Sequence, residues 1–468
     1  MRALHLSAGH RVARRHLITL ACVGVAVVMG ACKEITVPNY NSPNVDGLLE
    51  NPDAASVNTA VVGLLVGARA TVGAYAQTVG VFGRELYNLD QAEPRNFLSL
   101  LVEPLTPGGF GVDVGWSGTY RQLLTAQTIL DIVDKVPDLT APQKEGIKGF
   151  TKTFMAQAYI DQLRIRDTFG IVLTVDPTAK TLGDFVSRDE GFAKAASLLD
   201  EARTHLGAGG ATFSFTLTSG FTGFNTPATF VRVNRGLKAR METYRGRWAE
   251  ALTAVGESFI NTASPSAATL ATGVYHVYTT ASGDATNPMF DPAPRALVAH
   301  PSFLADAQRR ADGTQDSRTG KVATSATTLT SQGVSSNTRL NIAATNVAPV
   351  SLLRNEELIL IRAEANIGLG NRAAAISDLN IIRTVSGGLT PLPADFAGNL
   401  LDELLYNRRY SLFAEYGHRW VDMRRYGRLA SLPKFAATHR IYPLVPLPAD
   451  ECNQRNPQPR GCTQVSGI

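Results

Sequence analysis

Residues that could catalyse a reaction or hold a metal are sparse in this 468-residue sequence. Asp402 and Glu403 are adjacent on an expected amphipathic helix, so their carboxylates do not converge on one face. The segment 312–316 lacks the alternating oxygen ligands and the closing Glu of a calcium loop. His418 has no His or Cys partner at ligand spacing, and no phosphate- or dinucleotide-binding glycine motif is present. These residues predict no catalytic site, no metal and no cofactor.

Aromatic residues in or beside loops could instead bind a sugar. A sugar offers apolar C–H faces that stack on aromatic rings, and hydroxyls that need fixed polar partners. We expect the glycines on either side of Phe110 to leave the nearby rings accessible. Packing of each ring against neighbouring helices is the alternative. The candidate ligand-binding residues are Tyr87, Phe110, Trp116, Tyr120, Tyr275, Tyr278 and Phe290.

The elements that must position these rings are mostly helices. Apolar or small residues recur at helical spacing around 360–379, with a break at Leu369-Gly370-Asn371. Residues 237–254 align without gaps on 361–378, which places Gly246 on Gly370. Two hairpins with the same turn indicate stacked tetratricopeptide-like units. The sequence therefore predicts a mostly α fold with tetratricopeptide-like helical hairpins, long irregular loops and minor β structure.

Two capping boxes mark further helix starts, at Thr140 with Gln143 and at Ser187 with Glu190. Between the repeated hairpins lies an insert, 261–350, that is rich in Ser, Thr, Gly and Pro. We expect this insert to be irregular. A long irregular insertion in a helical scaffold is where function usually resides, so we expect ligand selectivity there and in 86–120.

The N-terminus has the order of a secretory signal: a basic region, an apolar run over 17–29, and small residues before Cys32. The last part looks like a bacterial lipobox. We expect residues 1–31 to be removed, Cys32 to be acylated, 32–47 to form a tether, and 48–468 to form a single domain. A plain signal peptide or a membrane anchor with a chance cysteine is the alternative.

Charge and cysteine content agree with export. The formal charge of +5 includes four arginines of 1–31, so the mature chain would carry only +1. Without a clustered basic face, nucleic acid is not an expected partner. Cys452 and Cys462 lie close together near the C-terminus, either as a disulfide in an oxidising compartment or as two free thiols. No His lies near them to complete a metal site.

The C-terminal third resembles the SusD/RagB family of outer-membrane nutrient-uptake lipoproteins. The resemblance rests on three ordered blocks: NEELILIRAEANIGLGN, then LLYNRRYSLFAEYGHRWVDMRRYG, then YPLVPLPADECNQRNP. Asn407 and Ser411 depart from it, because the family commonly has acidic residues at these positions. We expect Arg and acidic side chains of the second block to pair and lock the last helix to the scaffold. This expected structural network comprises Arg408, Arg409, Glu415, Arg419, Trp420 and Asp422.

The resemblance implies a SusD-like fold on a lipid-anchored protein of the outer membrane that faces the cell surface. It also implies a TonB-dependent transporter barrel as partner, and capture of a glycan or another oligomer, peptides included, without covalent chemistry. The ligand surface would lie in loops outside the hairpins. Two rival functions stay open: a secreted polysaccharide-degrading hydrolase, and a tetratricopeptide-type scaffold that binds only proteins.

Overall fold

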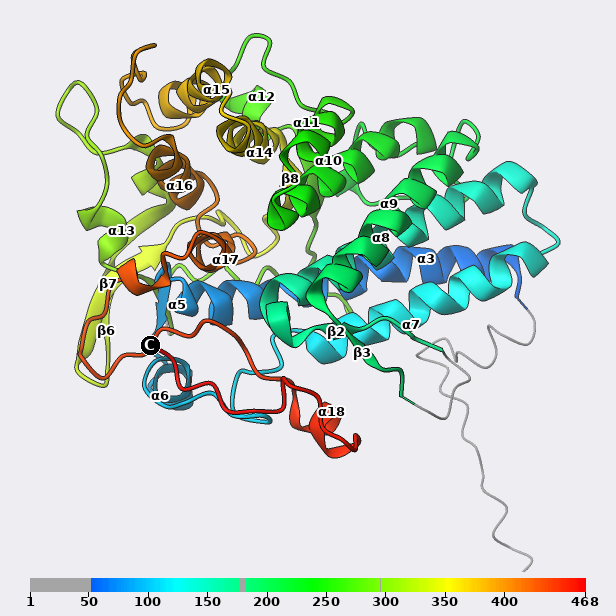
Figure 1. Cartoon of the computed structure of the whole chain (residues 1–468), viewed down its shortest axis with the longest axis horizontal. Helices are drawn as coiled ribbons and strands as arrows, with labels where there is room; N and C mark the ends of the chain where they lie inside the picture. Colours follow the sequence, from blue (N-terminus) through cyan, green and yellow to red (C-terminus); the bar gives the residue numbers. More distant parts are fainter. Residues whose placement is uncertain (1–51, 177–181, 295) are drawn as a thin grey trace, which may run out of the picture. The chain divides into compact units, whose positions relative to one another are not determined.

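The computed structural model describes residues 52–176, 182–294 and 296–468, and these are mostly helical, as the sequence predicts (Figure 1). The expected signal peptide, the lipidated Cys32 and the tether lie outside the described residues. The long helices form antiparallel layers that run from α3 past α7, α8, α9 and α10 to α14 and α15 (Figure 1). Their bounds are α3 Ala54–Ala70, α7 Trp116–Ile132, α8 Ala141–Arg166, α9 Arg188–Gly207, α10 Pro227–Arg245, α11 Trp248–Gly256, α14 Asn355–Gly368 and α15 Arg372–Val385.

Local sequence signals set the ends of these helices. Both predicted capping boxes are present, at the starts of α8 and α9. Gly246 and Gly370, the aligned turn residues of the two repeated hairpins, both take positive φ, at 70° and 77°. A residue without a Cβ adopts that conformation at little cost. The hairpins α10–α11 and α14–α15 therefore share one turn geometry, as the alignment predicts.

The first part of the chain is strongly apolar. Residues 54–82 form an almost continuous helical stretch that is long and apolar enough to cross a membrane, judged by length and composition alone. Val57, Val61 and Leu64 on this stretch are nevertheless fully or almost fully buried in the protein core. The same core contains a cluster of phenylalanine rings around Phe150 of α8, whose centroids lie 4.8 to 5.9 Å from it. Burial of its own apolar side chains in this core accounts for the apolar character of the stretch.

The insert 261–350 is more regular than the sequence predicts. Strands β6 (Val322–Ser331) and β7 (Val334–Leu340) form a hairpin within it. The turn residues Gln332 and Gly333 both have positive φ, the conformation that suits a two-residue hairpin turn. The Thr- and Ser-rich composition predicts irregular structure, but β-branched Thr also favours strands.

Strand pairing joins the two regions that the sequence marks as loops. Strand β1 (Leu86–Asn88) pairs with β5 (Leu297–Ala299), and β5 pairs with β7, in a sheet of order β1-β5-β7-β6. The remaining short elements are α4 Val72–Ala74, α5 Gly80–Phe82, α6 Arg95–Leu101, β2 Ile171–Val172, β3 Phe185–Val186, α12 Ala267–Ala271, β4 Gly273–His276, α13 Ser302–Ala305 and β8 Val350–Arg354.

The C-terminal segment contains α16 (Leu400–Ser411), α17 (His418–Arg425) and α18 (Ala449–Asn453). Two buried arginines tie it to the rest of the protein. Arg84 donates hydrogen bonds to the carbonyls of Val81, Pro433 and Arg440. Arg166 donates to the carbonyls of Val112, Asp113, Val445 and Pro446. Each guanidinium thus hydrogen-bonds several backbone carbonyls, most of which lie outside helices and strands.

Candidate functional site

Three of the seven predicted ligand-binding rings are buried, so the expectation that they are accessible is wrong. Tyr87 is 0% exposed, Trp116 3% and Tyr278 5%. Trp116 begins α7, where its ring contacts those of Tyr120 and Phe185 and its Nε1 donates to Glu451 at 3.3 Å. Gly115, directly before it, brings the chain against Thr71 at the end of α3, not away from it. A Cβ on Gly115 would lie 3.0 Å from the side chain of Thr71.

The other four rings are half-buried and lie in separate surroundings. Phe110 lies under the guanidinium of Arg95, and the hydroxyl of Tyr120 is held by the backbone N and O of Val172. Tyr275 donates to the carbonyl of Ala271. Among the seven predicted residues, all of which the structure describes, only Trp116 and Tyr120 have their rings in mutual contact. The predicted aromatics therefore do not form one binding platform.

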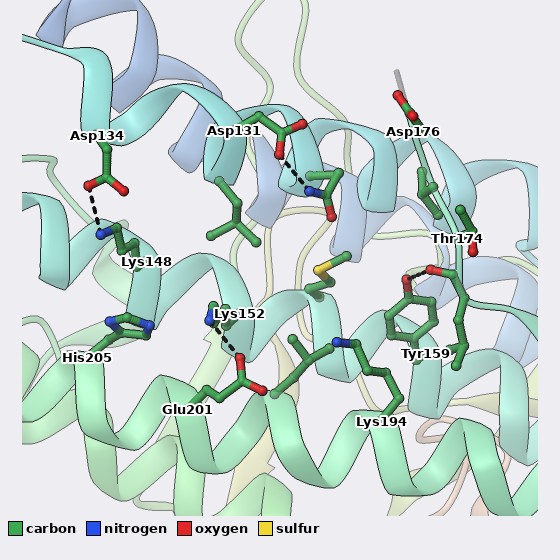
Figure 2. A pocket seen from close by; sticks show the side chains of 16 residues that line it. Asp131, Asp134, Lys148, Lys152, Tyr159, Thr174, Asp176, Lys194, Glu201 and His205 are labelled. Carbon is green, nitrogen blue, oxygen red and sulfur yellow. Dashed lines mark hydrogen bonds and ion pairs between the residues drawn. The ribbon is translucent and has the colours of Figure 1, made fainter. Parts of the chain in front are cut away.

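A large open groove lies elsewhere, on the helical layer. It has a volume of about 930 Å³ and runs between α7, α8, α9 and the residues that follow β2 (Figure 2). Helix α8 contributes Lys148, Lys152, Met155 and Tyr159, and α9 contributes Lys194, Leu198, Glu201 and His205. Both sets have the spacing 4-3-4, which places each on one helix face. Because the two helices are antiparallel, the faces meet residue by residue, Lys152 opposite Glu201.

Charged side chains in this helical groove are held by one another. Lys152 contacts Glu201 at 2.7 Å, and Lys148 contacts Asp134 of the turn after α7 at 2.8 Å (Figure 2). Burial alone would raise the pKa of Glu201, but hydrogen bonds from Lys152 and Ser197 outweigh it and the pKa is lowered. Ion pairs with neighbouring carboxylates likewise raise the pKa of Lys148 against the effect of burial. Both groups therefore stay ionised at neutral pH, with their positions fixed by the pairs.

The groove has an apolar floor below these charges. Met155 and Leu198 are almost fully buried, and Leu130 and Leu173 are half-buried beside them. The hydroxyl of Tyr159 is occupied, because it donates to the carbonyl of Leu173 at 2.8 Å. Four carboxylates and three ammonium groups line the rim. The arrangement can offer donors and acceptors to a polar ligand and apolar contacts beneath it.

Reasoning from the sequence missed this groove, although a signal was present. The 4-3-4 spacing of polar and apolar residues on two successive helices marks a face that is neither fully buried nor fully solvated. That the two faces meet depends on the register of the hairpin, which the spacing alone does not give.

The C-terminal residues expected to form a structural network pair with one another and with residues of the scaffold. Arg408 contacts Asp422 at 2.6 Å and Glu364 of α14 at 3.5 Å. Arg409 contacts Asp306 at 2.7 Å. Glu415 accepts from Arg354 at 2.5 Å, Arg419 donates to the carbonyl of Gly83, and Trp420 donates to that of Tyr442. The partners Gly83, Asp306 and Arg354 lie on distant segments, so these contacts fasten α16 and α17 to the rest of the chain.

Two further features bear on chemistry. Cys452 and Cys462 are joined by a disulfide, and their Cα atoms are 5.5 Å apart. Within the described ranges, no group of three or more His, Cys, Asp or Glu side chains is arranged to hold a metal ion.

Comparisons with known proteins agree with the mostly helical fold. Residues 312–462 match the model of the SusD family. A SusD superfamily protein from Bacteroides vulgatus is 15% identical, with a TM-score of 0.65 over 89% of this chain and 99% of that one. A SusD-like carbohydrate binding protein from Bacteroides vulgatus is 16% identical, with a TM-score of 0.57 over 80% and 83%.

A laminarin binding SusD-like protein is also similar, at 15% identity and a TM-score of 0.59, over 89% of this chain and 99% of that one. At these identities, the structural likeness shows a shared fold. None of the curated proteins compared with the chain matches it. The C-terminal region, 312–462, is thus similar to the SusD family, and the described chain shares the fold of SusD-like proteins over most of its length.

Proposed function

We propose that this protein binds an oligosaccharide and captures it in the helical groove of Figure 2. The observation that supports this most is the groove itself, an open cavity of about 930 Å³ with fixed charges of both signs above an apolar floor. A volume near 300–1,000 Å³ is typical of ligand sites. Two solved proteins of the same fold are described as carbohydrate binding and laminarin binding.

The balance of charge in the groove favours a neutral sugar chain. Every hydroxyl of a sugar can donate one hydrogen bond and accept others, so it suits a site that presents both carboxylates and ammonium groups. Lys152 and Glu201 hold each other at 2.7 Å, so both are already in place when a hydroxyl approaches. Leu198 and Met155 can then contact the C–H face of the ring.

The proposal also includes the membrane anchor, the location and the partner of the protein. Acylation of Cys32 would anchor it in the outer membrane, facing the cell surface, and a TonB-dependent barrel would receive the captured ligand. No covalent chemistry is part of this function. Labelling with a radioactive or clickable fatty acid, compared between wild type and Cys32→Ser, tests the anchor. Co-purification of a TonB-dependent barrel from the native membrane tests the partner, and its repeated absence would contradict delivery.

Calorimetry with laminari-oligosaccharides tests capture and its location. The double variant Lys152→Met/Glu201→Gln removes one charge of each sign from the groove, and we expect it to weaken binding at least tenfold. Hydrogen bonds to charged groups are each worth about 1.5–3 kcal/mol. The matched control is Arg203→Gln/Glu257→Gln, an exposed pair 2.9 Å apart that includes a residue of α9 but lies outside the groove. Its affinity should equal that of the wild type.

Other results would redirect the proposal. If Phe110→Ala or Phe290→Ala abolishes binding and the groove variant does not, the ligand lies on the loops where the aromatic residues predict it. Hydrolysis of a polysaccharide panel by the purified protein would favour the hydrolase alternative. Binding of peptides but of no sugar would favour the protein-interaction scaffold, for which the grooves between helical hairpins are also suited.

A further inference from the structure

A second pocket, distinct from the helical groove, is rich in arginine. It has a volume of about 440 Å³ and lies where the end of α8, the start of α9, the α10–α11 turn and α17 meet. We call it the arginine pocket, and the residues that matter for its chemistry are Asp167, Arg188, Arg245, Trp248, Arg424 and Arg425. Together with Arg164, five guanidinium groups share the lining with a single carboxylate.

Asp167, the single carboxylate, forms ion pairs with two arginines. Asp167 contacts Arg188 at 2.7 Å and Arg424 at 3.1 Å. Arg245 and Arg425 are paired with Glu242 and with Glu364 and Asp422, carboxylates that do not line the pocket. The pocket therefore presents more positive than negative charge to its interior.

Hydrogen-bonding capacity at this site is also incompletely used. The Nε atom of Arg425 is buried and has no hydrogen-bond acceptor among the described residues, whereas Nε of Arg424 lies 3.1 Å from Asp167. Burial lowers the pKa of Arg424 to about 10, only partly opposed by Asp167, so this guanidinium lacks full compensation. An unsatisfied buried donor is costly, and an added anion would satisfy it.

Aromatic side chains complete the walls. Phe192 lies under Arg188 and Tyr244 under Arg425, with guanidinium carbons 5.1 and 5.2 Å from the ring centroids. Trp248 is half-buried and packs on Gly368 of α14, where a Cβ would lie 2.5 Å from the indole. The orientation of the indole is therefore fixed. Rigid aromatic rings beside guanidinium groups suit a ligand that has both a ring and a negative charge.

We propose that the arginine pocket binds the carboxylate or sulfate group of an acidic sugar residue, so that acidic oligosaccharides belong to the substrate class of this protein. The choice of a sugar rests on the proposed function, whereas the choice of an anion rests on the pocket alone. Arg188 and Arg245 are the more open arginines, with 31% and 13% of their side chains exposed, and would meet the anion first.

Calorimetry on the full chain with trigalacturonate, and with its methyl ester, tests the charge requirement at nearly constant shape. We expect the acid to bind at least tenfold more tightly than the ester, because two charge-assisted hydrogen bonds are at stake. Arg188→Gln and Arg245→Gln should each weaken the binding of trigalacturonate about tenfold or more. The matched control is Arg247→Gln, an exposed arginine in the same turn as Gly246 that does not line the pocket. A sulfated oligosaccharide in a parallel titration distinguishes sulfate from carboxylate.

The outcomes separate this inference from the proposed function. Equal affinity for acid and ester, or wild-type affinity in both pocket variants, overturns the inference, even if neutral laminari-oligosaccharides still bind in the groove. Loss of neutral binding alone, with trigalacturonate still sensitive to Arg188→Gln, supports the arginine pocket and contradicts the groove. Tighter binding of a penta-glutamate peptide than of trigalacturonate, with the same sensitivity to the variants, would overturn the assignment to a sugar. Circular dichroism of each variant confirms that the fold is kept.

Discussion

Glu85 is expected to make the stability of this protein depend on pH, and Glu85→Gln should remove that dependence. The carboxylate is 1% exposed and lies between α5 and β1. It accepts one hydrogen bond, from the backbone N of Ala414 at 3.3 Å, and its other oxygen has no partner among the described residues. Burial raises the pKa of Glu85 from 4.5 to about 7, although Arg419 and Arg409 act in the opposite direction.

The sign follows from the raised pKa. The folded protein holds the Glu85 proton more tightly than the unfolded chain does. The contribution of this proton to the free energy of unfolding is therefore fully present below pH 4.5. It is lost as the pH rises through about 7. The difference between the pKa of Glu85 in the folded and the unfolded protein corresponds to about 3 kcal/mol of unfolding free energy, at about 1.36 kcal/mol for each pKa unit. The neutral amide of Gln does not ionise, so Glu85→Gln should be more stable than the wild type at pH 8 by about 1–3 kcal/mol.

Urea unfolding followed by circular dichroism, at several values between pH 5 and pH 8, measures this difference. The gain in unfolding free energy from Glu85→Gln should grow with pH and level off above 7. Glu103→Gln, a change at an exposed carboxylate, should shift stability by less than about 0.5 kcal/mol at each pH. A constant difference between Glu85→Gln and the wild type across this range would refute the reasoning, because it would show that Glu85 does not titrate there.

Two further predictions concern the scaffold. Arg408→Met should lower the unfolding free energy by about 3–5 kcal/mol, because Asp422 and the fully buried Glu364 lose a shared partner. Arg408→Met/Asp422→Asn in the same urea assay should cost less than the sum of the single changes, and strict additivity would contradict the coupling. Gly149→Ala should lower the unfolding free energy by about 1–3 kcal/mol, since the added Cβ would lie 2.6 Å from Cγ and 2.9 Å from the backbone N of Leu206. Gly207→Ala is the control, because nothing lies within 4 Å of its Cβ.

Signals confined to a few residues predicted much of the fold. The starts of α8 and α9 were predicted by Thr140 with Gln143 and by Ser187 with Glu190, because a capping box is complete within four residues. The turn glycines at 246 and 370 were identified by the internal repeat. The β6–β7 hairpin is not predicted, because the Thr and Ser content of this run is also typical of loops and Gln332-Gly333 is a weak turn signal.

The candidate site was harder to predict because its contacts join residues far apart in the sequence. Trp116 is buried by residues of α7 and β3 and by Glu451, which is 335 residues away in the sequence. The glycine content around Trp116 does not reveal these contacts. Lys152 and Glu201 lie on different helices, 49 residues apart in the sequence. Their pairing follows only from the antiparallel register of α8 and α9.

That register is set by glycines at the two ends of the α8–α9 hairpin. Gly149 of α8 lies against Leu206 of α9, and Gly191 of α9 lies against Leu163 of α8, with room at neither position for a Cβ. A shift of one helical turn would move a side chain by about 5.4 Å, enough to separate Lys152 from Glu201. The same hairpin ends beside Asp167 and begins at Arg188, so it also sets one wall of the arginine pocket. Close packing at two small residues therefore determines both proposed sites. For this reason, Gly149→Ala should weaken oligosaccharide binding even under conditions where the variant remains folded.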